Sequence, residues 1–195
     1  MTTLILSPYP EALGIEDAVV ADPDGDVLAQ AQTAGAEHLV VYGWRKILRG
    51  AVLERYAGRI VNLHISLLPH NRGADPNFWS WFDATPKGVS VHLIDAGVDT
   101  GPVLIQAEAQ FSPGPMTLAS TYAVLRTQVE SLFNAAWPDI RAGRLAPRAQ
   151  PAPGPRPRKA AEKTVWMSRL SAGWDTPVSE VEALGRQARR EREER

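Results

Sequence analysis

Short apolar runs alternate with stretches of helical periodicity along the first 110 residues. Each run is short and is bounded by polar or turn residues, as is typical of strands. The runs lie at 4–6, 18–20, 38–42, 59–64, 88–94 and 103–110, and the helical patterns between them at 25–35, 46–57 and 74–83. Strands that alternate with helices indicate βαβ units. We therefore predict an α/β fold with an open, mostly parallel, Rossmann-like sheet.

The pattern changes after the strand region. From Met116 to Arg141 apolar residues recur near the 3.6-residue period, which predicts one long amphipathic helix. Proline is then dense over 146–158, which favours an extended connector over a helix or a central strand. Helical periodicity with many charges returns over 178–195. We predict a main domain at residues 1–142 and a small C-terminal extension at residues 143–195.

The extension carries Trp166 and Trp174. Disordered segments are poor in aromatic residues, so we predict that this segment docks on a folded surface. That surface is the chain's own core or a partner subunit in a homodimer. Either arrangement would bury both tryptophans.

Charge and composition argue against several classes of function. The 195 residues include 21 basic and 22 acidic side chains, which argues against a general nucleic-acid-binding role. Residues 189–195 are rich in charge, but Arg and Glu alternate there, as on a solvated helix. The N-terminus lacks the pattern of a signal peptide, and no stretch approaches 18 apolar residues. We expect a cytoplasmic protein that acts without a membrane or a nucleic acid.

Several chemistries are disfavoured. The chain has no cysteine, which excludes thiolate nucleophiles, Cys-ligated zinc and iron–sulfur clusters. His70 and His92 lack a neighbouring histidine at metal-ligand spacing, so we predict no metal site. Ser66 does not lie in a Gly-x-Ser-x-Gly turn, which disfavours a serine hydrolase.

One strand carries polar residues where apolar ones are expected. Alternation along residues 59–66 places Asn62, His64 and Ser66 on one face of the strand. An interior parallel strand normally buries both faces, so this polar face needs a reason. In open α/β sheets ligands bind beyond the carboxyl ends of the strands. We interpret the polar face as part of a ligand site; an edge strand with one solvated face is the alternative.

Two polar loops follow this strand in the sequence. The first leads into helix 74–83, whose aromatic residues we assign to the core, and it contributes His70, Arg72, Asp75 and Asn77. The second is the turn 95–101, which carries Asp95 and Asp99 with two glycines. Turns of this composition are common. The second loop is therefore informative only in combination with the strand.

In combination, these motifs resemble the catalytic core of the 10-formyltetrahydrofolate-dependent formyltransferases, which include glycinamide-ribonucleotide, methionyl-tRNA and sugar N-formyltransferases. The resemblance covers roughly residues 36–142 and rests on two stretches, Asn62-Leu-His64-Ile-Ser66-Leu-Leu-Pro69-His-Asn-Arg72-Gly73-Ala and Asp95-Ala-Gly-Val-Asp99-Thr-Gly101. It implies that Asn62, His64 and Asp99 are the catalytic residues. The resemblance further implies that residues 1–142 form the catalytic domain.

The resemblance implies a folate site and an acceptor site. 10-Formyltetrahydrofolate would be the co-substrate, its pterin ring held by Trp44, Arg45, Lys46, Ile47, Leu48, Asp95, Gly97 and Val98. The acceptor would be a small-molecule amine, bound by Ser66, His70, Arg72, Asp75 and Asn77.

The residue types suit this chemistry. When an amine attacks a formyl carbon, negative charge develops on the formyl oxygen, and the Asn62 amide and His64 can donate hydrogen bonds to it. Losing one such donor costs about 3 kcal/mol of barrier. Asp99 can orient the imidazole and take the amine proton through water, while Ser66 orients His64 or a water. Direct transfer needs neither a metal nor a covalent intermediate.

Departures from the family pattern bear on the acceptor. Fewer residues precede Asn62 than is usual in the family, so we expect a shortened N-terminal half. Residues 7–11 contain two prolines and Glu11 where glycinamide-ribonucleotide formyltransferases have a phosphate-binding loop. The 55 residues after 140 are fewer than the tRNA-binding domain needs.

An amino sugar, an amino acid derivative and a natural-product intermediate therefore remain as possible acceptors. A 10-formyltetrahydrofolate hydrolase and a non-catalytic folate- or partner-binding module are the alternative functions.

Overall fold

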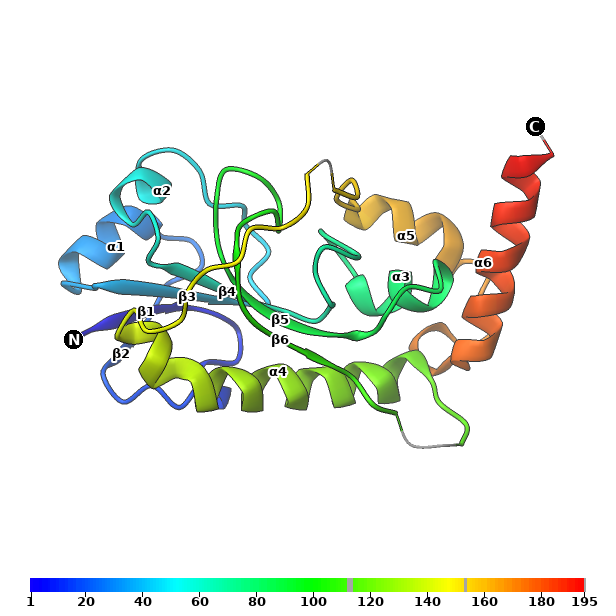
Figure 1. Cartoon of the computed structure of the whole chain (residues 1–195), viewed down its shortest axis with the longest axis horizontal. Helices are drawn as coiled ribbons and strands as arrows, with labels where there is room; N and C mark the ends of the chain where they lie inside the picture. Colours follow the sequence, from blue (N-terminus) through cyan, green and yellow to red (C-terminus); the bar gives the residue numbers. More distant parts are fainter. Residues whose placement is uncertain (112–113, 153, 195) are drawn as a thin grey trace.

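Six strands form one mixed sheet in a computed structural model that describes residues 1–111, 114–152 and 154–194 (Figure 1). The strand order is β2-β1-β3-β4-β5-β6. The strands are β1 (Thr3–Leu6), β2 (Ala18–Val20), β3 (His38–Tyr42), β4 (Ile60–His64), β5 (Gly88–Leu93) and β6 (Val103–Glu108). The first four run parallel, whereas β5 and β6 are antiparallel to their neighbours. The predicted α/β fold with a mostly parallel sheet is confirmed.

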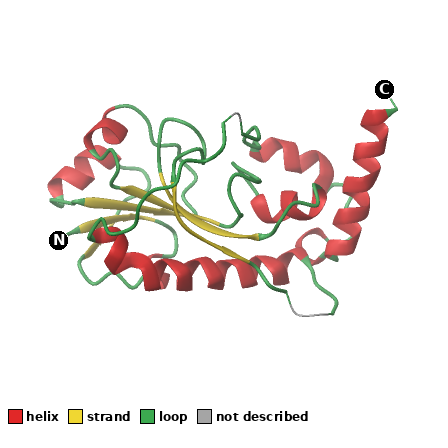
Figure 2. Cartoon of the chain, in the orientation of Figure 1, coloured by secondary structure: helices red, strands yellow, loops and turns green. Residues whose placement is uncertain are grey.

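Helices cover both faces of the sheet (Figure 2). On one face α1 (Val27–Thr33) and α2 (Ala51–Arg55) enclose a core that includes Leu4, Leu6 and Leu39. On the other face α4 (Leu118–Arg141) packs on the alternate strand residues, among them Ile5, Val61 and Leu63. The sheet is therefore a middle layer whose interior strands are buried on both sides.

The long helix α4 follows from its sequence. Thr117 caps its start, because its hydroxyl oxygen accepts from the Ser120 backbone N–H while the Ser120 hydroxyl oxygen accepts from the Thr117 backbone N–H. Leu125, Val129 and Phe133 recur every fourth residue and face the sheet, where each is fully or almost fully buried. The helix ends at Arg141, as the periodicity predicts.

Helix α2 is shorter than the pattern over 46–57 predicts. Only Ala51–Arg55 is helical, and residues 43–50 form a loop. Gly43 and Gly50 both have positive φ, at 65° and 63°, which a helix cannot accommodate. This loop starts at the end of β3, on the side of the sheet where ligands bind in this fold class.

A second, aromatic core joins the C-terminal extension to the main domain. Helix α3 (Pro76–Phe82) is buried along its whole length, which confirms the predicted core role of its aromatic residues. Helix α6 (Val178–Glu193) packs on it through Val178 and Val181. Helix α5 (Ala160–Met167) adds Trp166, whose ring lies 4.8 Å from that of Phe82.

The expected burial of both tryptophans is wrong for Trp174, which is 42% exposed. Its ring lies 5.7 Å from that of Tyr122 on α4, so one face of the indole is covered. Lys163 Nζ lies 4.9 Å from the centre of the same ring, so Trp174 packs against Tyr122 and Lys163 while remaining partly exposed.

Residues 146–152 and 154–158 are extended, as their proline content predicts, and they cross the sheet toward α3 (Figure 1). Residue 153 of the predicted connector lies outside the described residues. Two bridges join this stretch to the main domain. Arg148 forms an isolated antiparallel bridge with Val103, and Arg158 forms a parallel bridge with Gly73. We call residues 146–152 and 154–158 the crossing segment.

Within the described residues, none of the helices is both long enough and apolar enough to traverse a lipid bilayer.

Substitution of Gly185 tests the contact between α3 and α6. A Cβ at this position would collide with the Phe82 carbonyl oxygen. Gly→Ala in a helix normally stabilises a protein by about 0.5–1 kcal/mol. We expect the opposite sign for Gly185→Ala, a loss of about 1–3 kcal/mol in the free energy of unfolding from the forced separation of the helices. Urea unfolding measures it. Gln187→Ala on the exposed face of α6 is the control, and a stabilised Gly185→Ala would contradict the packing.

Candidate active site

Strand β4 carries the polar face of the site. Its apolar residues Val61 and Leu63 lie in the core under α4, which turns Asn62 and His64 to the opposite face. The antiparallel pairing with β5 sets Asn62 opposite His92. Two polar side chains of one strand thus meet a histidine of the next on the same surface.

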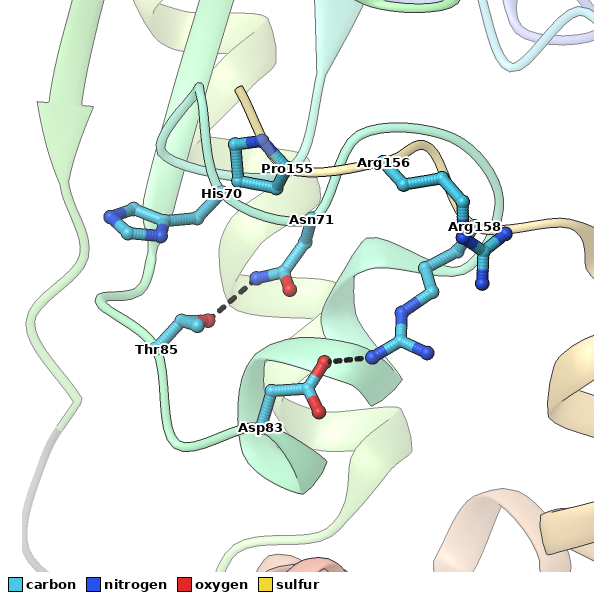
Figure 3. Close-up of a pocket in the computed structure, with 7 residues that line it drawn as sticks. All are labelled: His70, Asn71, Asp83, Thr85, Pro155, Arg156 and Arg158. Carbon is cyan, nitrogen blue, oxygen red and sulfur yellow. Dashed lines mark hydrogen bonds and ion pairs between the residues drawn. The ribbon is translucent and has the colours of Figure 1, made fainter. Parts of the chain in front are cut away.

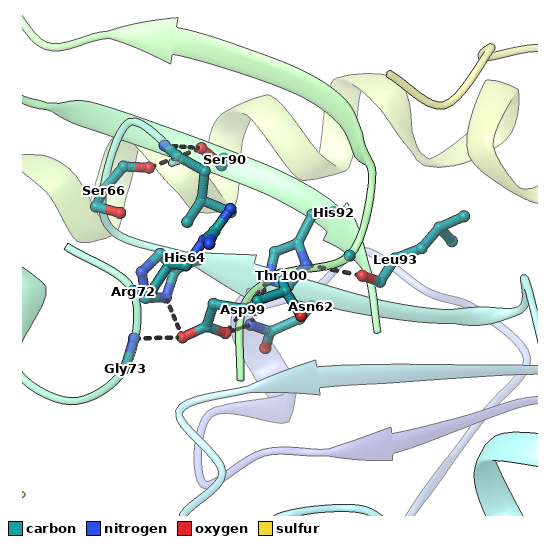
Figure 4. Close-up of polar contacts among 12 residues, drawn as sticks. Asn62, His64, Ser66, Arg72, Gly73, Ser90, His92, Leu93, Asp99 and Thr100 are labelled. Carbon is teal, nitrogen blue, oxygen red and sulfur yellow. Dashed lines mark hydrogen bonds and ion pairs between the residues drawn. The ribbon is translucent and has the colours of Figure 1, made fainter. Parts of the chain in front are cut away.

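Asp99 reaches this surface from the loop after β5 (Figure 4). Strand β5 ends beside Val61, so the loop must fold back to bring Asp99 over the later residues of β4. Asp99 adopts a left-handed conformation with φ of 52°. Gly101 passes so close to the Leu93 carbonyl that a side chain there would collide with it. These two features make the tight return possible.

The Asp99 carboxylate is surrounded by donors. Its Oδ2 accepts from the Gly73 N–H at 2.8 Å and lies 3.7 Å from His64 Nδ1. Its Oδ1 accepts from Asn62 Nδ2 at 3.3 Å and lies 3.5 Å from His92 Nε2. The side chain is 15% exposed. The three residues predicted to be catalytic are therefore brought together around one carboxylate.

The hydrogen-bond partners indicate where the protons lie on the two histidines. His64 Nε2 is 3.1 Å from the Asn71 carbonyl oxygen, which can only accept, so this nitrogen carries a proton. His92 Nδ1 likewise donates to the Leu93 carbonyl at 2.8 Å. In neutral His92 the Nε2 lone pair accepts from Asn62 Nδ2 at 3.0 Å. Both N–H groups of Asn62 are thus engaged, one with His92 and one with Asp99.

Burial and charge have opposite effects on the pKa values of Asp99 and His64. Burial alone would raise the pKa of Asp99, but interaction with the imidazoles of His64 and His92 and the hydrogen bond from Gly73 together hold it well below its usual range. Burial lowers the pKa of His64, and the Asp99 charge opposes this only in part. At neutral pH the site therefore holds an ionised Asp99 beside a neutral His64. The Gly73 and Asn62 hydrogen bonds stabilise the carboxylate whichever form His64 takes.

His92 is a member of the site that the sequence analysis missed. It was considered only as a metal ligand, yet it is 1% exposed and contacts both Asn62 and Asp99. A signal was present, because Ser90 and His92 interrupt the apolar run 88–94 with the same alternation that marks β4. Polar faces on two strands that pair would have identified it. No group of three or more His, Asp or Glu side chains suited to a metal occurs among the described residues.

The residues predicted to hold the folate lie in two loops beside this cluster. Trp44 and Ile94, at the starts of the two loops, pack against the same core that contains Leu48. Ile47 and Val98 are exposed, at 58% and 36%.

Other side chains of these loops have protein partners. Asp95 accepts from the Gly97 N–H and the Thr100 hydroxyl, and so shapes its own turn. Lys46 pairs with Asp24 at 3.5 Å. Arg45 lies exposed in the first loop.

The residues predicted to bind the acceptor are dispersed. Arg72 is buried and donates to Gln150, and Asp75 forms an ion pair with Lys163 of α5. Ser66 donates to the His70 carbonyl at 2.7 Å and not to His64. Asn77 lies apart from the others, because its amide joins α3 to α4 through the Leu118 carbonyl.

His70 lines a cavity of about 270 Å³ beside the site (Figure 3). The other lining residues are Asn71, Asp83, Thr85, Pro155, Arg156 and Arg158. Asn71 also provides the carbonyl that His64 bonds, so the cavity adjoins the catalytic cluster. The crossing segment forms one wall.

Comparison with known proteins decides the family. The sequence pattern of the formyl transferase family matches residues 18–136, which are more than half of the chain. The chain belongs to the formyl transferase family. The match includes Asn62, His64, His92 and Asp99, and so covers the cluster described above.

Among curated formyl transferases, methionyl-tRNA formyltransferase of Synechococcus sp. is 40% identical over 91 residues, which are 46% of this chain and 28% of that protein. The enzyme of that name from Deinococcus radiodurans is 37% identical over 111 residues, which are 56% of this chain and 35% of that protein. The chain thus matches well under half the length of these relatives.

A solved formyltransferase structure is similar along nearly the whole chain. Formyltransferase PseJ from Anoxybacillus kamchatkensis is 35% identical, with a TM-score of 0.84, and the match covers 95% of this chain and 100% of that one. That structure holds UDP-4,6-dideoxy-4-formamido-L-AltNAc and tetrahydrofolate. A sugar N-formyltransferase from Shewanella sp. shares the fold at 16% identity, with a TM-score of 0.73 over 95% of this chain and 87% of that one.

The neutral, buried His64 makes stability depend on pH. An unfolded chain takes up a proton on this residue as the pH falls through about 6.5, whereas the folded protein resists it because burial lowers the pKa. We therefore expect the free energy of unfolding to decrease from pH 7 to pH 5, and to decrease less in His64→Gln. Urea unfolding at both pH values checks this. Arg186→Gln, on the surface of α6, should show the full decrease; an equal decrease in His64→Gln would contradict the assignment.

Proposed function

We propose that this protein transfers a formyl group from 10-formyltetrahydrofolate to the amine of a small molecule. The observation that carries the proposal is the convergence of Asn62, His64 and Asp99 beside the carboxyl end of β4. An amide, an imidazole and an ionised carboxylate are the groups that addition of an amine to a formyl carbon requires. The family assignment supports the same chemistry.

The reaction forms one bond and breaks one bond. The acceptor nitrogen adds to the formyl carbon, and the tetrahedral intermediate then expels N10 of tetrahydrofolate, which leaves with a proton. Asn62 would stabilise the oxyanion, and His64 would do so once it is protonated, because its neutral form has its single N–H on the Asn71 carbonyl. The 3.3 Å contact from Asn62 to Asp99 is the longer of the two amide contacts, so this N–H is the one that a formyl oxygen would recruit.

Asp99 would act as the proton acceptor. Its low pKa makes it a weak base, so it would take the proton only after the attacking nitrogen has become positive in the intermediate, where the N–H is far more acidic than in the free amine. The carboxylate lies 3.7 Å from His64 Nδ1, and it would stabilise the imidazolium if His64 becomes protonated during the reaction.

The proposed acceptor class is an amino sugar carried on a nucleotide. The similarity to the Anoxybacillus formyltransferase extends over the whole of that chain, whereas the matches to tRNA enzymes cover 28% and 35% of their lengths. We place the acceptor between the catalytic cluster and residues 143–195, where Arg72, Asp75 and the cavity at His70 lie. Residues 1–142 would form the catalytic domain.

Replacement of Asp99 tests the proposed chemistry. Asp99→Asn keeps the size of the side chain but removes the charge and replaces one accepting oxygen by an NH₂ group, so it cannot take the proton. We expect kcat to fall by about 100-fold or more with little change in folate affinity. Release of tetrahydrofolate in the presence of amino-sugar nucleotides measures kcat. Near-normal kcat in the variant would contradict the role of Asp99, and release that does not depend on an acceptor would indicate a hydrolase.

Ligand stabilisation tests the folate site without an acceptor. A ligand that binds only the folded state raises the melting temperature by mass action. We expect 5-formyltetrahydrofolate, a stable analogue, to give a saturable increase that is weaker in Ile47→Asp and Val98→Asp. Val165→Asp, at an exposed position of α5, is the matched control. The absence of any shift at millimolar ligand would contradict the folate site.

A further inference from the structure

Gln150 lies in the crossing segment, outside every motif of the family resemblance, yet it contacts the catalytic loop. Its Nε2 donates to the carbonyl oxygen of Asp99 at 3.0 Å and to that of Gly101 at 2.6 Å. Its Oε1 accepts from Arg72 Nε at 3.0 Å and from Arg72 Nη2 at 2.7 Å. Four hydrogen bonds thus use both ends of one amide.

The orientation of this amide is fixed by its partners. The two carbonyl oxygens can only accept, and a guanidinium can only donate. A flipped amide would set its oxygen against the two carbonyls and its NH₂ against Arg72, and all four contacts would be lost. Gln150 therefore occupies a site that requires a donor on one side and an acceptor on the other.

The two segments that Gln150 links are also the two segments that position Asp99. One is the backbone of the loop that carries Asp99 itself. The other is Arg72, whose neighbour Gly73 donates its N–H to Asp99 Oδ2 at 2.8 Å. The position of Gln150 is also set independently, because Arg148 and Val103 exchange two backbone hydrogen bonds of 2.8 Å. The backbone near Gln150 is thus held by β6, while the Gln150 side chain holds the Asp99 loop.

We propose that Gln150 is a positioning residue that fixes the catalytic carboxylate against His64 and Asn62 by linking the Asp99 loop to Arg72. The part that concerns catalysis rests on the proposed formyl transfer. Gln150 does not touch the reacting atoms, and it acts through the backbone of Asp99. Displacement of a catalytic group by about 1 Å can lower a rate by about 100-fold, so a link of this kind matters for turnover.

Two substitutions separate the loop contacts from the Arg72 contact. Gln150→Glu keeps the acceptor for Arg72 but replaces the donor by an oxygen that repels the two carbonyls. Gln150→Met removes both sets of contacts at nearly the same volume. We expect both variants to lower kcat by about 10- to 100-fold while KM for the folate changes by less than about threefold. A role limited to anchoring Arg72 would leave Gln150→Glu with the kcat of the wild-type protein.

Amide hydrogen exchange at Gly73 provides a readout that needs no turnover. The Gly73 N–H is protected by its bond to Asp99, so release of the loop should accelerate its exchange at least about tenfold in both variants. Gln187→Met, at an exposed position of α6, is the control for loss of a surface glutamine and should change neither quantity. Far-UV circular dichroism confirms that each variant is folded.

The outcomes are distinguishable. Wild-type kcat in Gln150→Glu, or unchanged Gly73 exchange in Gln150→Met, overturns the positioning role. If the wild-type protein transfers no formyl group to any amine, the proposed function falls. The link between Gln150 and the Asp99 loop is then decided by Gly73 exchange alone.

Discussion

A buried negative charge is the constraint on which the rest of the site depends. Removing a carboxylate from water is costly unless hydrogen-bond donors and opposite charges replace the lost hydration. Asp99 receives them from β4, from β5 and from the loop at Gly73, which come from separate parts of the sequence. Each of these elements must be in place before the carboxylate can be buried, and the geometry of the site follows from that requirement.

The antiparallel direction of β5 helps to bring the partners of Asp99 together. Because β5 runs antiparallel to β4, its polar residues lie opposite those of β4, and His92 meets Asn62 directly. The loop that follows β5 leaves the sheet beside Val61, at the opposite end of β4 from His64, and has to fold back to reach the site. Its return lays Asp99 over the polar surface. The mixed sheet is thus part of the catalytic geometry as well as of the fold.

Local sequence patterns were sufficient to predict much of the fold and part of the site. Alternation along β4 identified its polar face, and the periodicity of α4 predicted its extent almost to the residue. The contributions of His92 and Gln150 were not found, because each depends on pairing between distant segments. Gln150 meets Asp99 across 51 positions in the chain. Proline content correctly predicted the extended conformation of residues 146–152 and 154–158, but composition alone says nothing about which surface such a segment crosses.

The path of the crossing segment has a consequence for synthesis on the ribosome. All six strands and the cluster around Asp99 are encoded by residue 108, whereas Gln150 and the bridge from Arg158 to Gly73 come later. In a nascent chain all six strands therefore leave the exit tunnel before the residues that hold the Asp99 loop in place. The contacts of Gln150 and Arg158 close long loops, the type of contact that slows folding most. The interval between synthesis of β6 and synthesis of these contacts is set by the translation speed over some fifty codons.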